Sequence, residues 1–125
     1  MPDLSLTILA ETYSVCRLTR TDPIAPVPGA VSWVVAAPDE ITLVCPSDRV
    51  PVAVEREDGW RCLRIEQTFA FDVPGILAAV LQPLAAAGIG ICATSTFSTD
   101  YVLVKAGDVE RAVETLQAAG HHIRP

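Results

Sequence analysis

Residues 72–76 (Asp-Val-Pro-Gly-Ile) form the segment of this 125-residue chain that is best suited to bind a small polar ligand. Their order predicts a strand-to-helix turn, in which Asp72 caps the helix and Gly75 leaves room for close approach. The start of a helix exposes free backbone N–H groups and a partial positive charge, which together suit a carboxylate. On these residues alone, a capped helix that binds nothing explains the segment as well as a ligand-binding turn does.

A second segment, residues 94–99 with the sequence TSTFST, is rich in hydroxyl groups for a chain whose residues are 50% hydrophobic. Serine and threonine hydroxyls can donate to and accept from a polar ligand. A half-buried strand, in which β-branched threonine is common, explains the composition equally well. Both interpretations are therefore carried forward.

Sequence patterns of catalysis are absent, so we expect neither an enzyme nor a cofactor. The chain has no GxSxG nucleophile turn and no Walker-type phosphate loop. His121 and His122 are adjacent, and a strand would direct them to opposite faces, so they cannot share one metal or one substrate. The four cysteines form no CxxC pair and lie in apolar segments, which favours small buried side chains in a reducing compartment over metal ligands.

Composition narrows the class of protein further. The net charge is −6, with 9 basic residues against 15 acidic ones and no basic cluster, which argues against nucleic acid and anionic membranes as partners. The first residues lack a signal-peptide pattern, and prolines and glycines interrupt the longest apolar stretch, so we expect a cytoplasmic protein. Because only 19% of the residues are charged, we expect apolar surface to be hidden against a second copy, in a homodimer.

The first half of the chain predicts mainly strands and turns. In order, the predicted elements are strands at 4–9 and 13–18 with a turn at Glu11 and Thr12, a proline-rich loop at 19–29, a hairpin of strands at 31–36 and 41–45, one helical turn at 46–51 capped by Ser47 or Asp48, and a charged turn at 55–59.

The second half predicts the order strand, helix, strand, strand, helix, strand. The strands are expected at 60–67, 89–97, 101–105 and 121–123. The first helix is expected at 74–87, and the second begins after a cap at Asp108. Gly88 and Gly120 should end the helices, and Pro83 interrupts the hydrogen bonding of the first one. The apolar face of that helix is Ile76, Leu77, Val80, Leu81 and Leu84. This order is that of the ferredoxin-like split βαβ unit, an antiparallel sheet with two helices on one face.

Residues 71–91 (FDVPGILAAVLQPLAAAGIGI) resemble the D-x-P-G-x-L…L-x-x-x-G-I-x-I signature of ACT domains, which are ferredoxin-like regulatory modules that bind amino acids where two domains pair. The matching residues are Asp72, Pro74, Gly75, Leu77, Gly88 and Ile91. Other stretches, such as LTILAETYSVCRL and STFSTDYVLVK, are similar to a family of small tandem ACT proteins and to the repeats of CASTOR, the cytosolic arginine sensor. The resemblance covers most of the chain. It implies an α+β fold with residues 1–60 as a degenerate, strand-rich ACT-like repeat and 61–125 as a complete ACT domain.

The resemblance also implies a ligand site. In ACT domains the effector lies between the strand–helix turn of one domain and a strand or loop of its neighbour. In CASTOR-like repeats an acidic residue meets the cationic end of the ligand, and Asp100 is the matching acid. The implied ligand-binding residues are Asp72, Val73, Pro74, Gly75, Ile76, Ser95, Thr96, Phe97, Ser98, Thr99 and Asp100.

Two functions follow as hypotheses. The first is a small, non-catalytic ligand sensor that binds an amino acid or similar zwitterion at an ACT-domain interface and exerts allosteric regulation. In it, the ligand's carboxylate meets the amides around Gly75 and Ile76, and its ammonium or side chain meets Asp100 or Asp72. The alternative is an ACT-fold interaction or dimerisation module that has lost ligand binding.

Overall fold

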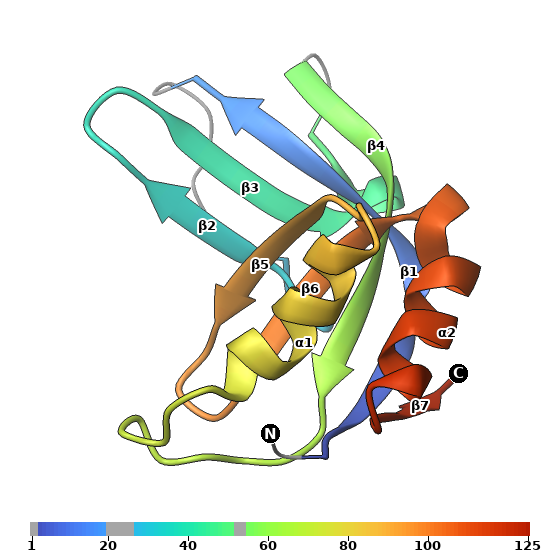
Figure 1. Cartoon of the computed structure of the whole chain (residues 1–125). Helices are drawn as coiled ribbons and strands as arrows, with labels where there is room; N and C mark the ends of the chain where they lie inside the picture. Colours follow the sequence, from blue (N-terminus) through green and yellow to red (C-terminus); the bar gives the residue numbers. More distant parts are fainter. Residues whose placement is uncertain (1–2, 20–26, 52–54) are drawn as a thin grey trace. The chain divides into compact units, whose positions relative to one another are not determined.

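In the computed structural model, which describes residues 3–19, 27–51 and 55–125, the chain divides into two units (Figure 1). We call Met1–Ala10 together with Arg61–Pro125 the helical unit, and Glu11–Trp60 the strand unit. Two long strands, β1 (Ser5–Leu18) and β4 (Glu55–Ile65), contribute residues to both. The first ten residues therefore belong to the same unit as the C-terminal half of the chain.

The helical unit has the predicted order of elements. After β4 come helix α1 (Ile76–Ala86), strands β5 (Ile91–Ser95) and β6 (Asp100–Lys105), the 3-10 turn η2 (Ala106–Asp108), helix α2 (Val109–Ala118) and strand β7 (His122–Arg124). The prediction of a β-α-β-β-α-β order is confirmed, and the unit is an α+β, ferredoxin-like fold.

Strand β1 adds a strand to the predicted sheet of the helical unit, between β7 and β4. The strands lie in the order β7-β1-β4-β6-β5, with β5 and β6 antiparallel. Strands β1 and β7 are parallel, with Ser5 opposite His122 and Thr7 opposite Arg124. Residues 5–7 are thus paired in the sheet with residues 122–124.

Both helices pack on one face of this sheet (Figure 1). The predicted apolar face of α1 is confirmed, because Ile76, Val80 and Leu84 are buried and Leu77 and Leu81 pack against them. Spacings of four residues place these side chains on one side of a helix. They join buried side chains of the sheet and of α2, namely Leu4, Leu6, Leu63, Ile65, Val102, Val104, Ala112 and Leu116.

The strand unit contains the predicted hairpin. Strands β2 (Trp33–Ala36) and β3 (Ile41–Pro46) are antiparallel, and β3 pairs on its other side with β1. Its core includes Cys16 and Cys45, and burial raises the pKa of the Cys45 thiol to about 11. Cys62 is also buried and Cys92 partly so, which confirms that the cysteines behave mainly as small buried side chains.

Two predicted turns are wrong. Glu11 and Thr12 lie within β1, which runs unbroken because this pair offers no glycine, proline or asparagine to reverse the chain. Residues 55–59 are extended as the start of β4. There Glu55 pairs with Arg17 of β1 at 3.3 Å, so the charged run is part of an exposed strand with a cross-strand ion pair rather than a turn.

The predicted helix caps make none of the expected bonds. The N-cap residue of the single turn η1 (Ser47–Arg49) is Pro46, so the predicted caps Ser47 and Asp48 lie inside the turn, and the Ser47 hydroxyl bonds to that of Ser14 at 2.7 Å. Asp108 is the N-cap residue of α2, but its carboxylate pairs with Arg111 at 3.0 Å. Both long helices end shortly before the predicted glycines, Gly88 and Gly120.

The proline-rich loop predicted at 19–29 falls mostly on residues 20–26, which lie outside the described residues. Within the described part, Pro28 and Gly29 form a turn, and residue 27 is in neither a helix nor a strand, in agreement with the predicted loop. Neither α1 nor α2 has the length and apolarity that a membrane-crossing helix needs, and no other helix of the described residues does.

Candidate functional site

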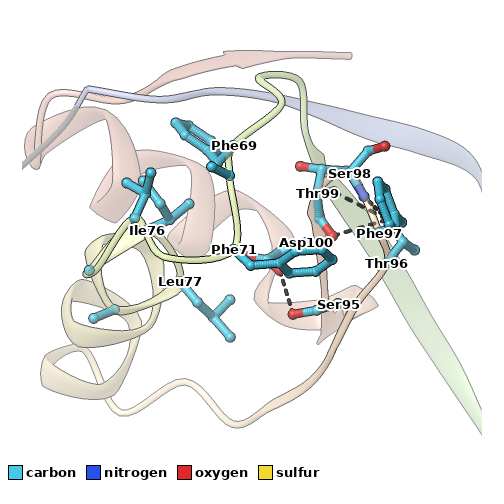
Figure 2. A pocket seen from close by; sticks show the side chains of 14 residues that line it. Phe69, Phe71, Ile76, Leu77, Ser95, Thr96, Phe97, Ser98, Thr99 and Asp100 are labelled. Carbon is cyan, nitrogen blue, oxygen red and sulfur yellow. Dashed lines mark hydrogen bonds between the residues drawn. The ribbon is translucent and has the colours of Figure 1, made fainter.

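A cavity of about 310 Å³, which we call the hairpin pocket, lies in the helical unit between the start of α1 and the β5–β6 hairpin (Figure 2). All the predicted ligand-binding residues except Asp72 and Pro74 line it. The volume is at the small end of the range for small-molecule sites. The lining residues are Phe69, Ala70, Phe71, Val73, Gly75, Ile76, Leu77, Ala78, Ser95, Thr96, Phe97, Ser98, Thr99 and Asp100.

The first wall of the hairpin pocket is the start of α1. Gly75 is the N-cap residue, and its φ of 82° is a left-handed conformation that L side chains rarely adopt. The first helical bond runs from the N–H of Ala79 to the carbonyl of Gly75, at 3.0 Å. The N–H groups of Ile76, Leu77 and Ala78 therefore have no acceptor within the helix, and these residues border the pocket.

The predicted capping role of Asp72 is wrong. No side chain caps α1, because the left-handed turn at Gly75 separates Asp72 and Pro74 from the first helical residue. Ahead of that turn, the N–H of Val73 donates to the carbonyl of Ala70 at 3.2 Å, which reverses the chain. The positive end of α1 is consequently left without a carboxylate from its own chain segment.

The second wall is the hairpin between β5 and β6. Ser95 and Asp100 are opposite each other in the ladder, and the Ser95 hydroxyl donates to Asp100 Oδ1 (Figure 2). The Thr96 hydroxyl donates to the carbonyl of Thr99 at 3.1 Å and accepts the Thr99 N–H at 3.2 Å. The Thr99 hydroxyl donates to the carbonyl of Ile65 on β4 at 2.8 Å. The hydroxyl-rich composition of this segment thus holds the hairpin in shape.

Two phenylalanines meet at the edge of the hairpin pocket. Phe71 precedes α1 and Phe97 lies at the tip of the hairpin, and their rings contact edge-to-face with centroids 5.1 Å apart (Figure 2). Their exposed fractions are 77% and 83%, although large apolar side chains are usually buried. An exposed aromatic pair that bridges both walls of a cavity is typical of a binding surface.

Sequence reasoning missed part of this lining, namely Phe69, Ala70, Phe71, Leu77 and Ala78. Two signals could have found some of them. Leu77 and Ala78 belong to the same first helical turn as Ile76, and Phe71 is the aromatic residue directly before the Asp72 turn. Phe69 and Ala70 carry no such signal.

The side chains that line the hairpin pocket include an acid but no base. Asp100 is the only ionisable side chain among the lining residues, and none of them is lysine, arginine or histidine. Positive character comes from the backbone alone, at the start of α1. The cavity therefore offers N–H donors on one wall and a carboxylate on the other.

Two other sets of polar groups in the described part of the chain make structural bonds. His121 is buried between Leu4 and Ala79, away from the pocket lining. A second cavity of about 220 Å³ in the strand unit is lined by charged side chains, among which Arg17 pairs with Glu40 and Glu55. The hairpin pocket is the site where apolar and polar groups converge.

Comparison with known proteins identifies the family. Residues 55–118 match the family model described as the ACT domain. The crystal structure of protein Atu0741 from Agobacterium tumefaciens is 36% identical, covers 98% of this chain and 93% of its own, and superposes with a TM-score of 0.90. This chain belongs to the ACT domain family, and the predicted resemblance is confirmed.

The chain is also similar to two other proteins. The cytosolic arginine sensor for mTORC1 subunit 1 from Homo sapiens is 42% identical over 59 residues, which are 46% of this chain and 18% of the sensor. The chain thus matches less than a fifth of that relative's length. The regulatory subunit of aspartate kinase from Thermus thermophilus shares the fold, with a TM-score of 0.64 at 11% identity over 91% of this chain and 95% of that subunit.

Proposed function

We propose that this protein is a non-catalytic regulatory protein that binds an amino acid or similar zwitterion in the hairpin pocket. The observation that carries the proposal is the pairing of unused N–H groups at the start of α1 with the carboxylate of Asp100 across one cavity. A zwitterion has the matching charges at its two ends. A cytoplasmic location and assembly as a homodimer are parts of the same proposal.

The proposed pose follows from the two walls. The ligand's carboxylate accepts from the N–H groups of Ile76 and Leu77 near Gly75, where a substituent would meet no other atom within 4 Å. Its positively charged end meets Asp100, while Asp72 takes no part because it does not line the pocket. The apolar side chains of Phe69, Ile76 and Leu77 exclude water from the space between them (Figure 2).

Family membership supports a regulatory role. The sensor from Homo sapiens that matches 46% of this chain is named for arginine, and the Thermus thermophilus neighbour is a regulatory subunit. We further propose that the strand unit is the remainder of a degenerate ACT-like repeat, as expected for residues 1–60. In that arrangement a second subunit can complete the site.

Thermal unfolding of the full chain with each of the twenty amino acids at millimolar concentration tests the proposal. A ligand that binds only the folded state at a hundred times its Kd adds about 2.7 kcal/mol of stability. We expect one or a few amino acids to raise the Tm. If none of them does so, the proposal is wrong.

Substitution at Gly75 tests whether the rise in Tm comes from binding in the hairpin pocket. Gly75→Trp should abolish the Tm increase, because its ring fills the open space beside the start of α1. Gly75→Ala is the matched control, since it carries the same strain of a side chain at positive φ with little volume. It should retain the response. Loss in both variants would instead point to the backbone of the turn.

The exposed aromatic pair favours a second candidate, an interaction module that binds no small molecule. Phe71 and Phe97 would then contact a protein partner or a second copy of the chain. This function predicts an oligomeric state that no amino acid changes. Analytical ultracentrifugation with and without the amino-acid panel separates the two candidates.

A further inference from the structure

The segment that connects β4 to α1 borders the hairpin pocket. We call residues 68–74 of this segment the strap. Every residue of the strap is exposed except Phe69, which is partly buried and packs against the hydrophobic core of the helical unit. Several strap residues line the pocket, namely Phe69, Ala70, Phe71 and Val73. The strap therefore forms one side of the cavity while contributing little to the core.

Both ends of the strap are fixed to the fold. Just before it, Oε1 of Gln67 accepts the N–H of Ser5 at 3.1 Å. Just after it, Gly75 leads into α1, whose first residue is buried. Between these ends, one hydrogen bond joins the strap to another segment of the described chain, from the N–H of Phe69 to the carbonyl of Ser98 at 3.4 Å. A segment with fixed ends and few bonds between them opens without unfolding its neighbours.

The contact between Phe71 and Phe97 is a second link between the strap and the hairpin. Figure 2 shows Phe71 pointing from the strap toward the hairpin, where its ring meets that of Phe97. Because both rings are largely exposed, separating them uncovers little further apolar surface. The edge-to-face attraction that joins them is modest, so thermal motion breaks and remakes it.

From these contacts we infer that the strap is a movable cover of the hairpin pocket, and that Phe71 and Phe97 form the clasp that holds it shut. The clasp joins the two walls of the cavity, so the rings part when a ligand passes between the walls and close again once it is bound. The inference rests on the proposed function. It adds an opening step that limits how fast an amino acid enters and leaves.

Rates of binding to the full chain test the clasp. Association and dissociation rate constants are taken from NMR line shapes in a titration with the amino acid of the twenty-member panel that raises the Tm most. Phe97→Ala removes the clasp and leaves the sequence of the strap unchanged. We expect the association rate constant to rise about twofold to tenfold, because the open state no longer requires breaking a ring contact. The dissociation rate constant should rise by a larger factor, because the ring's contact with the bound ligand is lost as well.

Phe97→Tyr is the matched control, since it keeps an aromatic ring at an exposed position that accommodates a hydroxyl. It should restore the slow association of the wild type. If Phe97→Ala raises only the dissociation rate constant, the ring contacts the ligand without controlling its entry. The inference is then wrong, while the proposed function stands.

A measurement without ligand separates the clasp from the proposed function. The N–H of Phe69 bonds to Ser98 between the strap and the hairpin, so its exchange with solvent reports opening of the strap. In the ligand-free chain, Phe97→Ala should speed this exchange about twofold to tenfold in NMR measurements, and Phe97→Tyr should not. Unchanged exchange in Phe97→Ala would overturn the inference even if an amino acid binds. If no amino acid binds, the proposed function is wrong, and the exchange of Phe69 alone decides whether the clasp holds the strap.

Discussion

His121 supplies the hydrogen bond that Pro83 removes from helix α1. Proline has no N–H, so the carbonyl of Ala79, four residues earlier, loses its helical donor. The Nε2 of His121 lies 2.9 Å from that oxygen, while its Nδ1 lies 3.0 Å from the N–H of Leu4. Because a carbonyl only accepts and an N–H only donates, these two contacts fit the tautomer that carries its proton on Nε2. One buried side chain thus joins Leu4, the residue directly before β1, to Ala79 of α1.

Replacing His121 should therefore lower the free energy of unfolding by more than the loss of its apolar contacts alone would. His121→Leu leaves two buried backbone groups without partners, at about 1–3 kcal/mol each. In a Pro83→Ala background the new N–H serves Ala79, so the same substitution should cost about 1 kcal/mol less. Urea unfolding of the four proteins measures this coupling.

The neighbouring histidine, His122, is the control for this double-mutant cycle of His121 and Pro83. His122 is exposed on β7, and His122→Leu should change the free energy of unfolding by no more than about 0.5 kcal/mol. Strictly additive effects of the His121 and Pro83 substitutions would show that the histidine does not replace the missing helical donor.

Phe71→Ser and Phe97→Ser should weaken ligand binding with little effect on stability. Both rings are exposed, so folding buries little of their area, whereas in the proposed complex the ligand contacts their open faces. We expect a loss of affinity of about threefold to tenfold for each variant in calorimetric titrations. Val35→Ser, which changes an exposed apolar residue of the strand unit, should leave affinity unchanged. A fall in Tm of many degrees would assign the rings to folding instead.

The hydroxyl of Thr99 ties the hairpin wall to β4, so Thr99→Val should destabilise the protein. The substitution keeps the shape of the side chain but leaves the carbonyl of Ile65 without its donor at 2.8 Å. We expect a loss of about 1–2 kcal/mol in urea unfolding, together with weaker ligand binding. Ser98→Ala removes a hydroxyl that makes no such bond, and it should match the wild type in stability.

Protonation of Glu66 should lower the free energy of unfolding in acid. Hydrogen bonds from Arg64, at 2.9 and 3.1 Å, and from Thr7 hold the pKa of Glu66 below its ordinary value of 4.5. A carboxyl whose pKa is lowered by folding contributes stability above its unfolded pKa and loses it as pH falls through the folded value. Between about pH 6 and about pH 3, Glu66→Gln should therefore lose less stability than the wild type.

Much of the helical unit could be predicted from sequence because its signals are local. The 3.6-residue spacing of Ile76, Val80 and Leu84 predicts α1, and the two polar segments of the ligand site are visible as a turn with Gly75 and a hydroxyl-rich run ending at Asp100. The structure brings these segments to one cavity.

What could not be predicted depends on partners distant in sequence. Residues 55–59 resemble a solvated turn until Arg17, on another strand, is known to pair with Glu55. Asp72 is a good N-cap by composition, and only the backbone turn at Gly75 removes it from the helix. The bonds of His121 span 117 residues to Leu4 and 42 to Ala79, so no local pattern could reveal them.

The parallel pairing of β1 with β7 has a consequence for the order of events during synthesis. Ser5 cannot pair with His122 until residue 122 has been translated, so the sheet of the helical unit lacks this strand pair at earlier stages of synthesis. Closing a loop of more than a hundred residues is entropically costly and slows folding. The residues of β1 and β4 that belong to the strand unit are available much earlier, and nascent chains should therefore acquire that unit's hairpin first and complete the helical unit last.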